Sequence, residues 1–299
     1  MKCVLSFIVC LIGVACGGQN DAGKIGPVNL PSAQTLFSDV ESGHYALVAG
    51  GSKGIGYAIA EALAKRRYNL ILIARHQIAL DKAKANFENT YKIHVETLKL
   101  DLAEVSTADS VAKWCNSKNI RLKILCNVAG YGGPKDFLSL PADSLRYMVR
   151  LNVESCMALT LDLLPLLEKN HPAYILNVAS MAGFAPIPSK NMYSATKSAV
   201  VFFSQSLRQQ LKTKDITVSC LSPGPVFTKP EIYADTKKKL GWFGLQLAVP
   251  PEKVGEIAVR ETLRGKMMIV PGFLPKVVSF FVRLLPMRWA AALYGIGYK

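Results

Sequence analysis

The segment Tyr45-Ala-Leu-Val-Ala-Gly50-Gly-Ser-Lys-Gly54-Ile-Gly56 joins a short apolar run to a glycine-rich turn, and the helical pattern of Tyr57–Arg67 follows directly. Glycines permit a tight turn and let the backbone approach a pyrophosphate at a helix N-terminus, where free N–H groups favour anions. A strand, a glycine turn and a helix in this order predict a dinucleotide site. The residues expected to contact the cofactor here are Gly50, Ser52, Lys53, Gly54, Ile55 and Gly56.

Apolar runs and helical patterns alternate along the rest of the chain. The expected strands are Tyr45–Ala49, Asn69–Ala74, Val95–Leu100, Leu122–Val128, Tyr174–Ala179, Ile216–Leu221 and Met268–Val270. The expected helices include Ala79–Tyr91, Thr107–Ser117, Pro141–Lys169 and one carrying Tyr193 and Lys197. This alternation indicates an α/β fold, a single Rossmann-like doubly wound parallel sheet with helices on both faces. Ligands of such sheets bind beyond the carboxyl ends of the strands.

The residue that follows the second strand, Arg75, bears on the choice of cofactor. NAD-binding folds usually place an acidic residue here to bond the ribose 2′-hydroxyl, whereas an arginine suits a 2′-phosphate. Lys53 in the glycine turn adds a second cation. These two cations predict that NADP(H) is preferred over NAD(H).

A hydroxyl, a phenol and an ammonium group lie within the stretch Ser180–Lys197. Ser180 directly follows an apolar strand pattern. Tyr193 and Lys197 are four residues apart in a helical pattern and therefore share a face. A cation beside a phenol favours phenolate and lowers the tyrosine pKa from its free value of roughly 10. Proton exchange at Tyr193 near neutrality would follow. Taken alone, this spacing more often belongs to an ordinary surface Tyr and Lys than to a catalytic pair.

The motifs between Tyr45 and Gly272 together resemble the short-chain dehydrogenase/reductase family. The family's Thr-Gly-x-x-x-Gly-x-Gly appears as Ala49–Gly56 with Ala in the first position, and its Asn-Asn-Ala-Gly appears as Asn127–Gly130 with Val in the second. The resemblance implies an NAD(P)-dependent enzyme acting on CH–OH or carbonyl groups. It adds as cofactor contacts Asp101, Leu102, Asn127, Ala129, Gly130, Tyr193, Lys197, Pro223, Gly224, Val226 and Thr228.

The family's catalytic residues match at Asn152, Ser180, Tyr193 and Lys197. The resemblance implies that Tyr193 gives a proton to a carbonyl oxygen and that Lys197 lowers the Tyr193 pKa and bonds the nicotinamide ribose. Ser180 would orient the substrate oxygen, and Asn152 would hold a water that relays protons to Lys197. With NADPH, the expected direction is reduction of a carbonyl to an alcohol. The alternative is a catalytically silent NADP(H)-binding sensor or scaffold at a membrane.

Large apolar residues dominate the two segments expected on the substrate side, after Ser180 and after Thr228. The expected substrate contacts are Ser180, Phe184 and Tyr193, and Glu231–Val249 is interpreted as a mobile lid. A pocket of this composition suits a lipophilic ketone, such as a 3-oxoacyl group or a steroid-like ketone.

Composition narrows the remaining classes of function. The 299 residues carry a net charge of +15, but the basic runs are short and scattered and no nucleic-acid motif accompanies them, so we expect no nucleic-acid partner. The seven cysteines and four histidines show no metal-ligand spacing, and we assign no metal site. Cys126 and Cys220 lie in apolar runs and are expected to be buried thiols. Family resemblance makes a homodimer or homotetramer an open expectation.

The two ends of the chain lie outside the expected catalytic domain, residues 44–272. Residues 1–20 resemble a secretory signal, with small residues before Cys16 as in a bacterial lipoprotein; an uncleaved anchor or a misassigned start is the alternative. Residues 21–43 are interpreted as a linker. Residues 273–299 hold no acidic residue and form a basic, amphipathic tail broken at Pro275 and Pro286. This tail predicts association with a membrane surface, or else packing over the substrate cleft or a partner subunit. A membrane-associated location follows, with a cytoplasm-facing domain as the alternative.

Overall fold

The computed structural model describes residues 43–133, 137–138, 140–228, 233–234 and 245–295. The chain divides into two units, Met1–Ser32 and Ala33–Lys299, and every described residue belongs to the second. The expected anchor over residues 1–20, with its Cys16, and the expected linker up to residue 42 therefore lie outside the described residues.

Seven parallel strands form one sheet in the order β3-β2-β1-β4-β5-β6-β7, which confirms the predicted doubly wound fold. The strands are β1 (His44–Ala49), β2 (Asn69–Ala74), β3 (Val95–Lys99), β4 (Arg121–Asn127), β5 (Ala173–Val178), β6 (Ile216–Leu221) and β7 (Met268–Ile269). The ends of five strands are in register, because residues at or one before their last position pair in one row across the sheet: Ile73, Ala49, Asn127, Asn177 and Cys220. The segment after each strand therefore reaches the same edge. The strand order reverses between β1 and β4, where ligands of such sheets bind.

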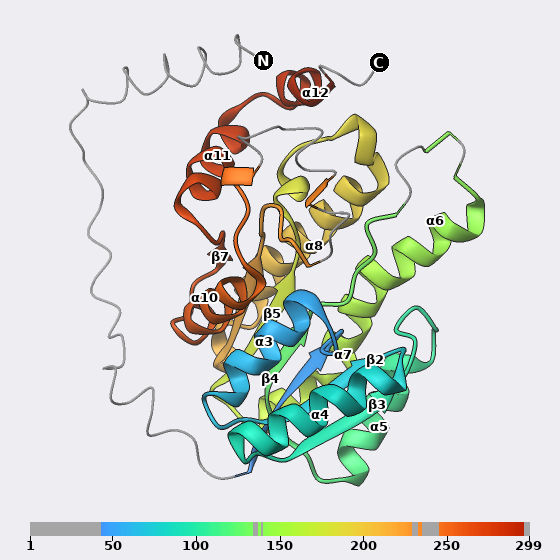
Figure 1. Cartoon of the computed structure of the whole chain (residues 1–299), viewed down its shortest axis with the longest axis vertical. Coiled ribbons are helices and arrows are strands. Elements are labelled where there is room, and N and C mark those ends of the chain that lie inside the picture. Colours follow the sequence, from blue (N-terminus) through green and yellow to red (C-terminus); the bar gives the residue numbers. More distant parts are fainter. Residues whose placement is uncertain (1–42, 134–136, 139, 229–232, 235–244, 296–299) are drawn as a thin grey trace, which may run out of the picture. The chain divides into compact units, whose positions relative to one another are not determined.

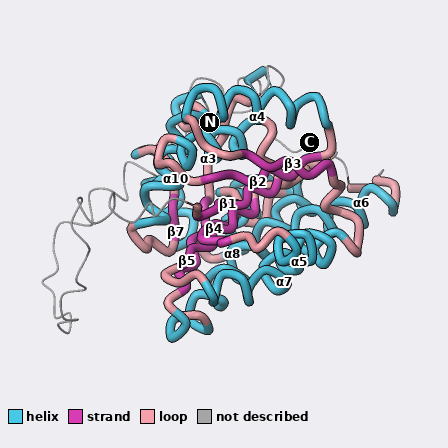
Figure 2. Tube along the Cα trace, turned by 90° about the horizontal axis from the view of Figure 1, so that it is seen from below, coloured by secondary structure: helices cyan, strands magenta, loops and turns pink. Residues whose placement is uncertain are grey.

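Helices cover both faces of the sheet, with α3, α4 and α10 on one side and α5, α7 and α8 on the other (Figures 1 and 2). The helices are α3 (Gly54–Ala64), α4 (Gln77–Tyr91), α5 (Thr107–Ser117), α6 (Ala142–Val149), α7 (Ser155–Lys169), α8 (Asn191–Gln210), α10 (Pro251–Leu263), α11 (Phe273–Leu284) and α12 (Met287–Gly295). The strands are apolar on both faces, as a sheet covered on both sides requires. Separate apolar clusters fill the two layers.

Helix α10 has no counterpart among the elements expected from the sequence. It packs closely against α3: a Cβ atom built on Gly255 would lie 2.3 Å from the carbonyl oxygen of Ala58. Only a glycine allows the two helices to approach so closely. Beside this contact, Arg66, two residues after the end of α3, donates hydrogen bonds to the Glu256 carboxylate.

Three further elements differ from the prediction. Helix α3 begins at Gly54, so the glycine turn runs directly into its first turn. The single helix expected over Pro141–Lys169 is instead α6 and α7, joined by the π-helical turn η1 (Arg150–Glu154). Pro275 does not break the tail, because it lies in the first turn of α11, where its missing N–H costs nothing. The expected break at Pro286 is confirmed by the boundary between α11 and α12.

The end of the described chain packs onto the segment that follows β5. Val282 of α11 and Ala290 of α12 belong to one apolar cluster with Phe184 and Ala185. Among the described residues, no helix is both long enough and apolar enough to cross a membrane.

Candidate active site

The glycine turn after β1 lies against the segment after β4. Gly50 has a φ of +92°, and a Cβ on it would lie 2.8 Å from the Ala129 nitrogen. A Cβ on Gly56 would lie 2.0 Å from the Gly50 carbonyl oxygen. A side chain at either position would collide with the backbone of this region. Because both residues are glycine, backbone atoms are free to face a ligand. No side chain caps the N-terminus of α3, so its first N–H groups remain available to an anion.

The segment after β6 closes the other side of this groove. Thr228 lies against the glycine turn, with its Cγ2 atom 3.1 Å from a Cβ built on Gly54. The Pro223 carbonyl accepts a hydrogen bond of 3.0 Å from the Met181 N–H, which ties this segment to the one after Ser180. Pro223, Gly224, Val226 and Thr228 thus lie at the edge where they were predicted.

Arg75 lies beyond the end of β2 in a small polar cluster. Its Nη1 atom donates a 2.6 Å hydrogen bond to the Tyr147 hydroxyl oxygen and lies 3.9 Å from the Asp101 carboxylate. The Tyr147 hydroxyl also donates to Asp101 at 3.3 Å. The Arg75 side chain is 53% exposed, so its guanidinium can still meet a phosphate from solvent. Sequence reasoning missed Tyr147, because its partners are distant along the chain.

Asn127 takes part in a buried network rather than presenting its side chain at the surface. Its amide nitrogen donates to the Asn177 side-chain oxygen at 2.9 Å and to the Thr160 hydroxyl at 3.0 Å. Asn177 donates in turn to the Ser204 hydroxyl at 3.0 Å. This network links β4, β5, α7 and α8 at the row of paired residues near the strand ends.

The segment with Ser180 is attached to the helix that carries Tyr193 and Lys197. A Cβ on Gly183 would lie 2.8 Å from the Lys197 carbonyl carbon and oxygen, so the turn η2 (Met181–Phe184) lies directly on α8. The Ser198 hydroxyl donates to the Gly183 carbonyl at 2.8 Å. This packing brings the Ser180 hydroxyl into hydrogen-bond contact with Tyr193.

Burial controls the ionisation of both Tyr193 and Lys197. The pKa of Tyr193 is raised because burial disfavours the phenolate, and the hydrogen bond with Ser180 offsets this only in part. This direction is opposite to the lowering predicted from the sequence. The Lys197 ammonium donates to the Val178 carbonyl at 2.8 Å and lies 5.9 Å from the centre of the Tyr193 ring. Burial lowers the pKa of Lys197 to about 8, because it disfavours the charged ammonium group.

Three hydrogen bonds to Tyr131 and Thr196 fix the Asn152 side chain. Its side-chain oxygen accepts from the Tyr131 N–H at 2.7 Å, and its amide nitrogen donates to the Tyr131 carbonyl at 2.9 Å and to the Thr196 hydroxyl at 3.1 Å. The π-helical turn η1 carries this side chain, and such turns often mark functional sites. A Cβ on Gly130 would lie 3.4 Å from the Asn152 oxygen and 3.2 Å from the Lys197 ammonium. Asn152, Gly130 and Lys197 therefore meet at one point. Sequence reasoning missed Tyr131 and Thr196, which hold the amide in place.

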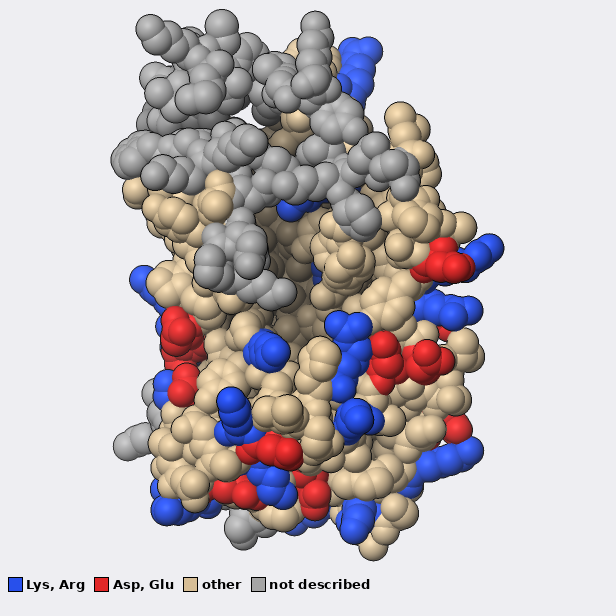
Figure 3. Space-filling model, turned by 45° about the vertical axis from the view of Figure 1, so that its right-hand side comes forward, with Lys and Arg blue, Asp and Glu red and all other residues tan. Residues whose placement is uncertain are grey.

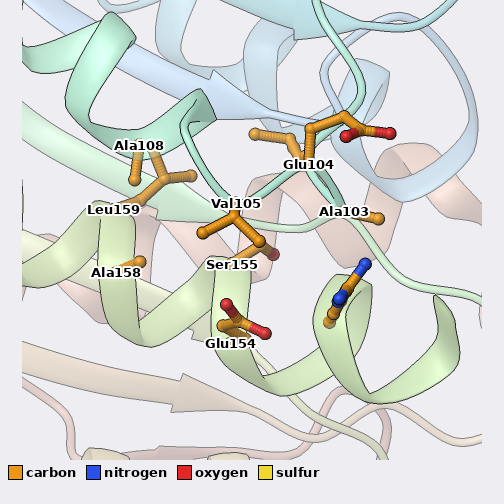
Figure 4. Close-up of a pocket in the computed structure, with 10 residues that line it drawn as sticks. Ala103, Glu104, Val105, Ala108, Glu154, Ser155, Ala158 and Leu159 are labelled. Carbon is orange, nitrogen blue, oxygen red and sulfur yellow. The ribbon is translucent and has the colours of Figure 1, made fainter. Parts of the chain in front are cut away.

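Phe184, one of the expected substrate contacts, is buried, and the Arg283 guanidinium lies 5.4 Å from the centre of its ring. Most of the expected lid, Glu231–Val249, lies outside the described residues. A small pocket elsewhere separates the loop at Leu102–Val105 from the start of α7 and includes Glu154 and Ser155 (Figure 4). The residues that line it include Leu102, one of the expected cofactor contacts, but not Ser180, Tyr193 or Lys197.

These features define a dinucleotide-binding α/β domain with a Ser–Tyr–Lys cluster at its switch point. The family model for short chain dehydrogenases matches residues 44–239. The chain belongs to this family of NAD(P)-dependent oxidoreductases.

Named relatives and solved structures agree with this assignment. The chain is 33% identical over 239 residues to very-long-chain 3-oxoacyl-CoA reductase-B of Danio rerio, with 74% of each chain covered. It is 34% identical to reductase-A of the same fish over 62% of this chain and 59% of that protein. The match thus spans about three fifths of that relative's length. A short-chain dehydrogenase from Sphingobium yanoikuyae in complex with NADPH superposes with a TM-score of 0.68 at 27% identity, covering 76% of this chain and 87% of that one.

Proposed function

We propose that this protein reduces a carbonyl group of a lipophilic substrate to an alcohol with NADPH. The observation that carries the proposal is the convergence of Ser180, Tyr193 and Lys197 beside Gly130, in the segment that follows β4. In an ordinary surface pair the lysine would be exposed. Here Lys197 is buried and hydrogen-bonded to β5, the strand that precedes Ser180.

The groove fits a dinucleotide phosphate. The backbone of Gly50 and Gly54 has conformations that side chains would strain, and the uncapped N-terminus of α3 suits a pyrophosphate. Lys53 and Arg75 would hold a 2′-phosphate, for which a guanidinium offers paired donors. Bound there, NADPH supplies the hydride.

Within this proposal, the Tyr193 hydroxyl donates its proton to the carbonyl oxygen as negative charge develops on that atom. Ser180 donates a second hydrogen bond to the same oxygen and thereby orients it. Burial keeps Tyr193 protonated in the resting enzyme, so the acid is present when the substrate arrives. Positioned general acids of this kind contribute on the order of 10²–10⁴-fold to the rate.

Lys197 stabilises the phenolate that this proton transfer leaves behind, because its ammonium group lies over the Tyr193 ring. The proton then returns from solvent. We propose that Asn152 supports this return by fixing the Tyr131 backbone and Thr196 around the lysine. The Asn152 side chain already makes three hydrogen bonds within the protein. A relay water would therefore donate a hydrogen bond to the side-chain oxygen of Asn152, which can accept a second one, or bind to its backbone.

The substrate class follows from the apolar surroundings of Ser180 and from the relatives. Met181 follows the serine directly and packs against the apolar cluster that contains Phe184, and the relatives are named very-long-chain 3-oxoacyl-CoA reductases. We propose a long-chain 3-oxoacyl thioester as the substrate, with a steroid-like or other lipophilic ketone as the second choice. Such a substrate favours an enzyme that works at a membrane surface. Attachment through Cys16, the side of the membrane and assembly into a dimer or tetramer stay predictions.

A panel of carbonyl compounds tests this proposal. It pairs 3-oxoacyl thioesters of increasing chain length with NADPH and, in parallel, with NADH, and follows cofactor oxidation. We expect turnover that rises with chain length and is faster with NADPH. NADPH binding without oxidation of any panel member would support a sensor or scaffold instead.

A further inference from the structure

The outer face of α11 and the start of α12 is apolar, aromatic and basic. We call the docking face the set of exposed residues Phe273, Lys276, Phe280, Arg283, Leu284, Met287, Arg288 and Trp289. Phe273 is 83% exposed, Leu284 65% and Trp289 53%, values that are costly for large apolar side chains in water. The opposite side of α11 is the one that packs on the protein, through Pro275, Ser279 and Val282.

The spacing of these residues makes a continuous stripe. Phe273 and Phe280 are two helical turns apart, and Leu284 and Met287 follow at intervals of four and three. Lys276 and Arg283 lie three residues after the two phenylalanines and flank the stripe. α11 has 12 residues, or about 18 Å of helix, which is too short to cross a bilayer core of about 30 Å. A helix of this kind lies in the plane of a membrane surface.

Charge decides what covers the docking face. The docking face carries three cations, Lys276, Arg283 and Arg288, and the sequence from Phe273 to the last residue has no Asp or Glu. If a second copy of the chain bound through the same face, the cations of the two copies would lie close together and repel each other, because a two-fold contact pairs identical patches. An anionic lipid surface complements the cations and receives the aromatic side chains at the headgroup level.

We propose that the docking face binds an anionic membrane surface, with α11 lying parallel to it. The same helix contacts the segment after Ser180: Arg283 lies over the Phe184 ring, and Pro275 lies near Gly224. The bound membrane would therefore adjoin the mouth of the candidate active site. Only this last consequence, the entry of a lipid-like substrate from the membrane, rests on the proposed function.

The test uses the full chain without cofactor or substrate, so it is independent of any activity. Vesicles of phosphatidylcholine and photoactivatable phosphatidylserine are cross-linked to the protein, and the modified peptides are identified by mass spectrometry. We expect lipid adducts on peptides that contain residues 273–292. Adducts confined to residues 1–20, or none at all, would overturn the proposal, as would self-association of the chain through α11.

Paired substitutions supply the quantitative test. Phe280→Glu combined with Trp289→Glu should weaken sedimentation with phosphatidylserine vesicles by about tenfold or more, because apolar contact is lost and two negative charges face the lipid. The matched control is Leu161→Glu with Phe202→Glu, two exposed apolar residues of α7 and α8 at 70% and 64% exposure. Circular dichroism checks that both variants fold. Equal binding by the two variants would contradict the proposal.

Discussion

Lys197 is 4% exposed, and its ammonium group donates a hydrogen bond to the buried Val178 carbonyl. Burial lowers its pKa to about 8, whereas the lysine of the unfolded chain has a pKa near 10.5. Between these values the unfolded chain binds more protons than the folded one, so the contribution of this group to stability rises with pH. Below pH 8 the charged lysine is held at a cost.

Substitution of Lys197 by Met should reveal this dependence. We predict that the free energy of unfolding of the cofactor-free wild type, minus that of Lys197→Met, increases between pH 8 and 10. The gain should be on the order of 2–3 kcal/mol. Denaturant unfolding of both proteins across this pH range measures it. A difference that does not change with pH would show that Lys197 is not desolvated.

Arg75 is the residue on which the predicted cofactor preference depends. Arg75→Ser should raise the KM for NADPH by about ten- to a hundredfold, because hydrogen bonds to charged groups contribute about 1.5–3 kcal/mol, and should change the KM for NADH little. Steady-state kinetics with both cofactors measures the shift. Arg146→Ser is the matched control, since Arg146 is an exposed arginine that pairs with Asp143. An equal loss with both cofactors would place Arg75 away from the 2′-phosphate.

The predictability of the site differs from residue to residue. Ser180, Tyr193 and Lys197 could be named because they match the family's motif, whereas their spacing alone would also fit a surface pair. Tyr131, Tyr147 and Thr196 could not, since they act through contacts between distant segments. The pKa of Tyr193 was predicted in the wrong direction, because spacing reveals a nearby cation but does not reveal burial.

Helix α10 shows why one element of the fold escaped prediction. A glycine inside a helix costs about 1 kcal/mol relative to alanine, so Gly255 weakens the local helical signal. Its reason is tertiary, namely the approach of Ala58. The π-helical turn at Asn152 is likewise set by distant partners. The strands were predicted well, since a parallel sheet covered on both faces needs continuous apolar runs.

Gly255→Ala tests the contact between α3 and α10. The added Cβ would meet the Ala58 carbonyl at 2.3 Å, so we predict destabilisation by about 1–3 kcal/mol despite the better helix propensity of alanine. Gly132→Ala is the control, because a Cβ there meets nothing within 4 Å. Thermal unfolding compares the two. A stabilised Gly255→Ala variant would mean that the helices are not packed so closely.

The net charge of the molecule says less about its partners than the distribution of that charge does. A net +15 invites a nucleic-acid partner, yet on the face shown in Figure 3 lysines and arginines are interspersed with acidic residues rather than gathered into one stripe. Ion pairs such as Lys113–Asp109 and Arg146–Asp143 use part of this charge locally. The acid-free stretch is the C-terminal one, which we assign to a lipid surface.

Duplex DNA should therefore bind only weakly and without specificity. We predict that any binding seen by fluorescence anisotropy at about 50 mM salt is lost at about 200 mM, as expected for a purely electrostatic contact. Tight binding that persists at the higher salt would revive a nucleic-acid function.

The whole domain brings one phenol to the switch point of the sheet, and the proposed chemistry depends on it. The most direct measurement is the rate of NADPH oxidation with a long-chain 3-oxoacyl thioester by wild type and by Tyr193→Phe, together with NADPH affinity from fluorescence titration. We predict that the variant binds NADPH normally but reduces the substrate at least about 10²-fold more slowly. Undiminished turnover by Tyr193→Phe would contradict the assignment of Tyr193 as the acid and, with it, the proposed function.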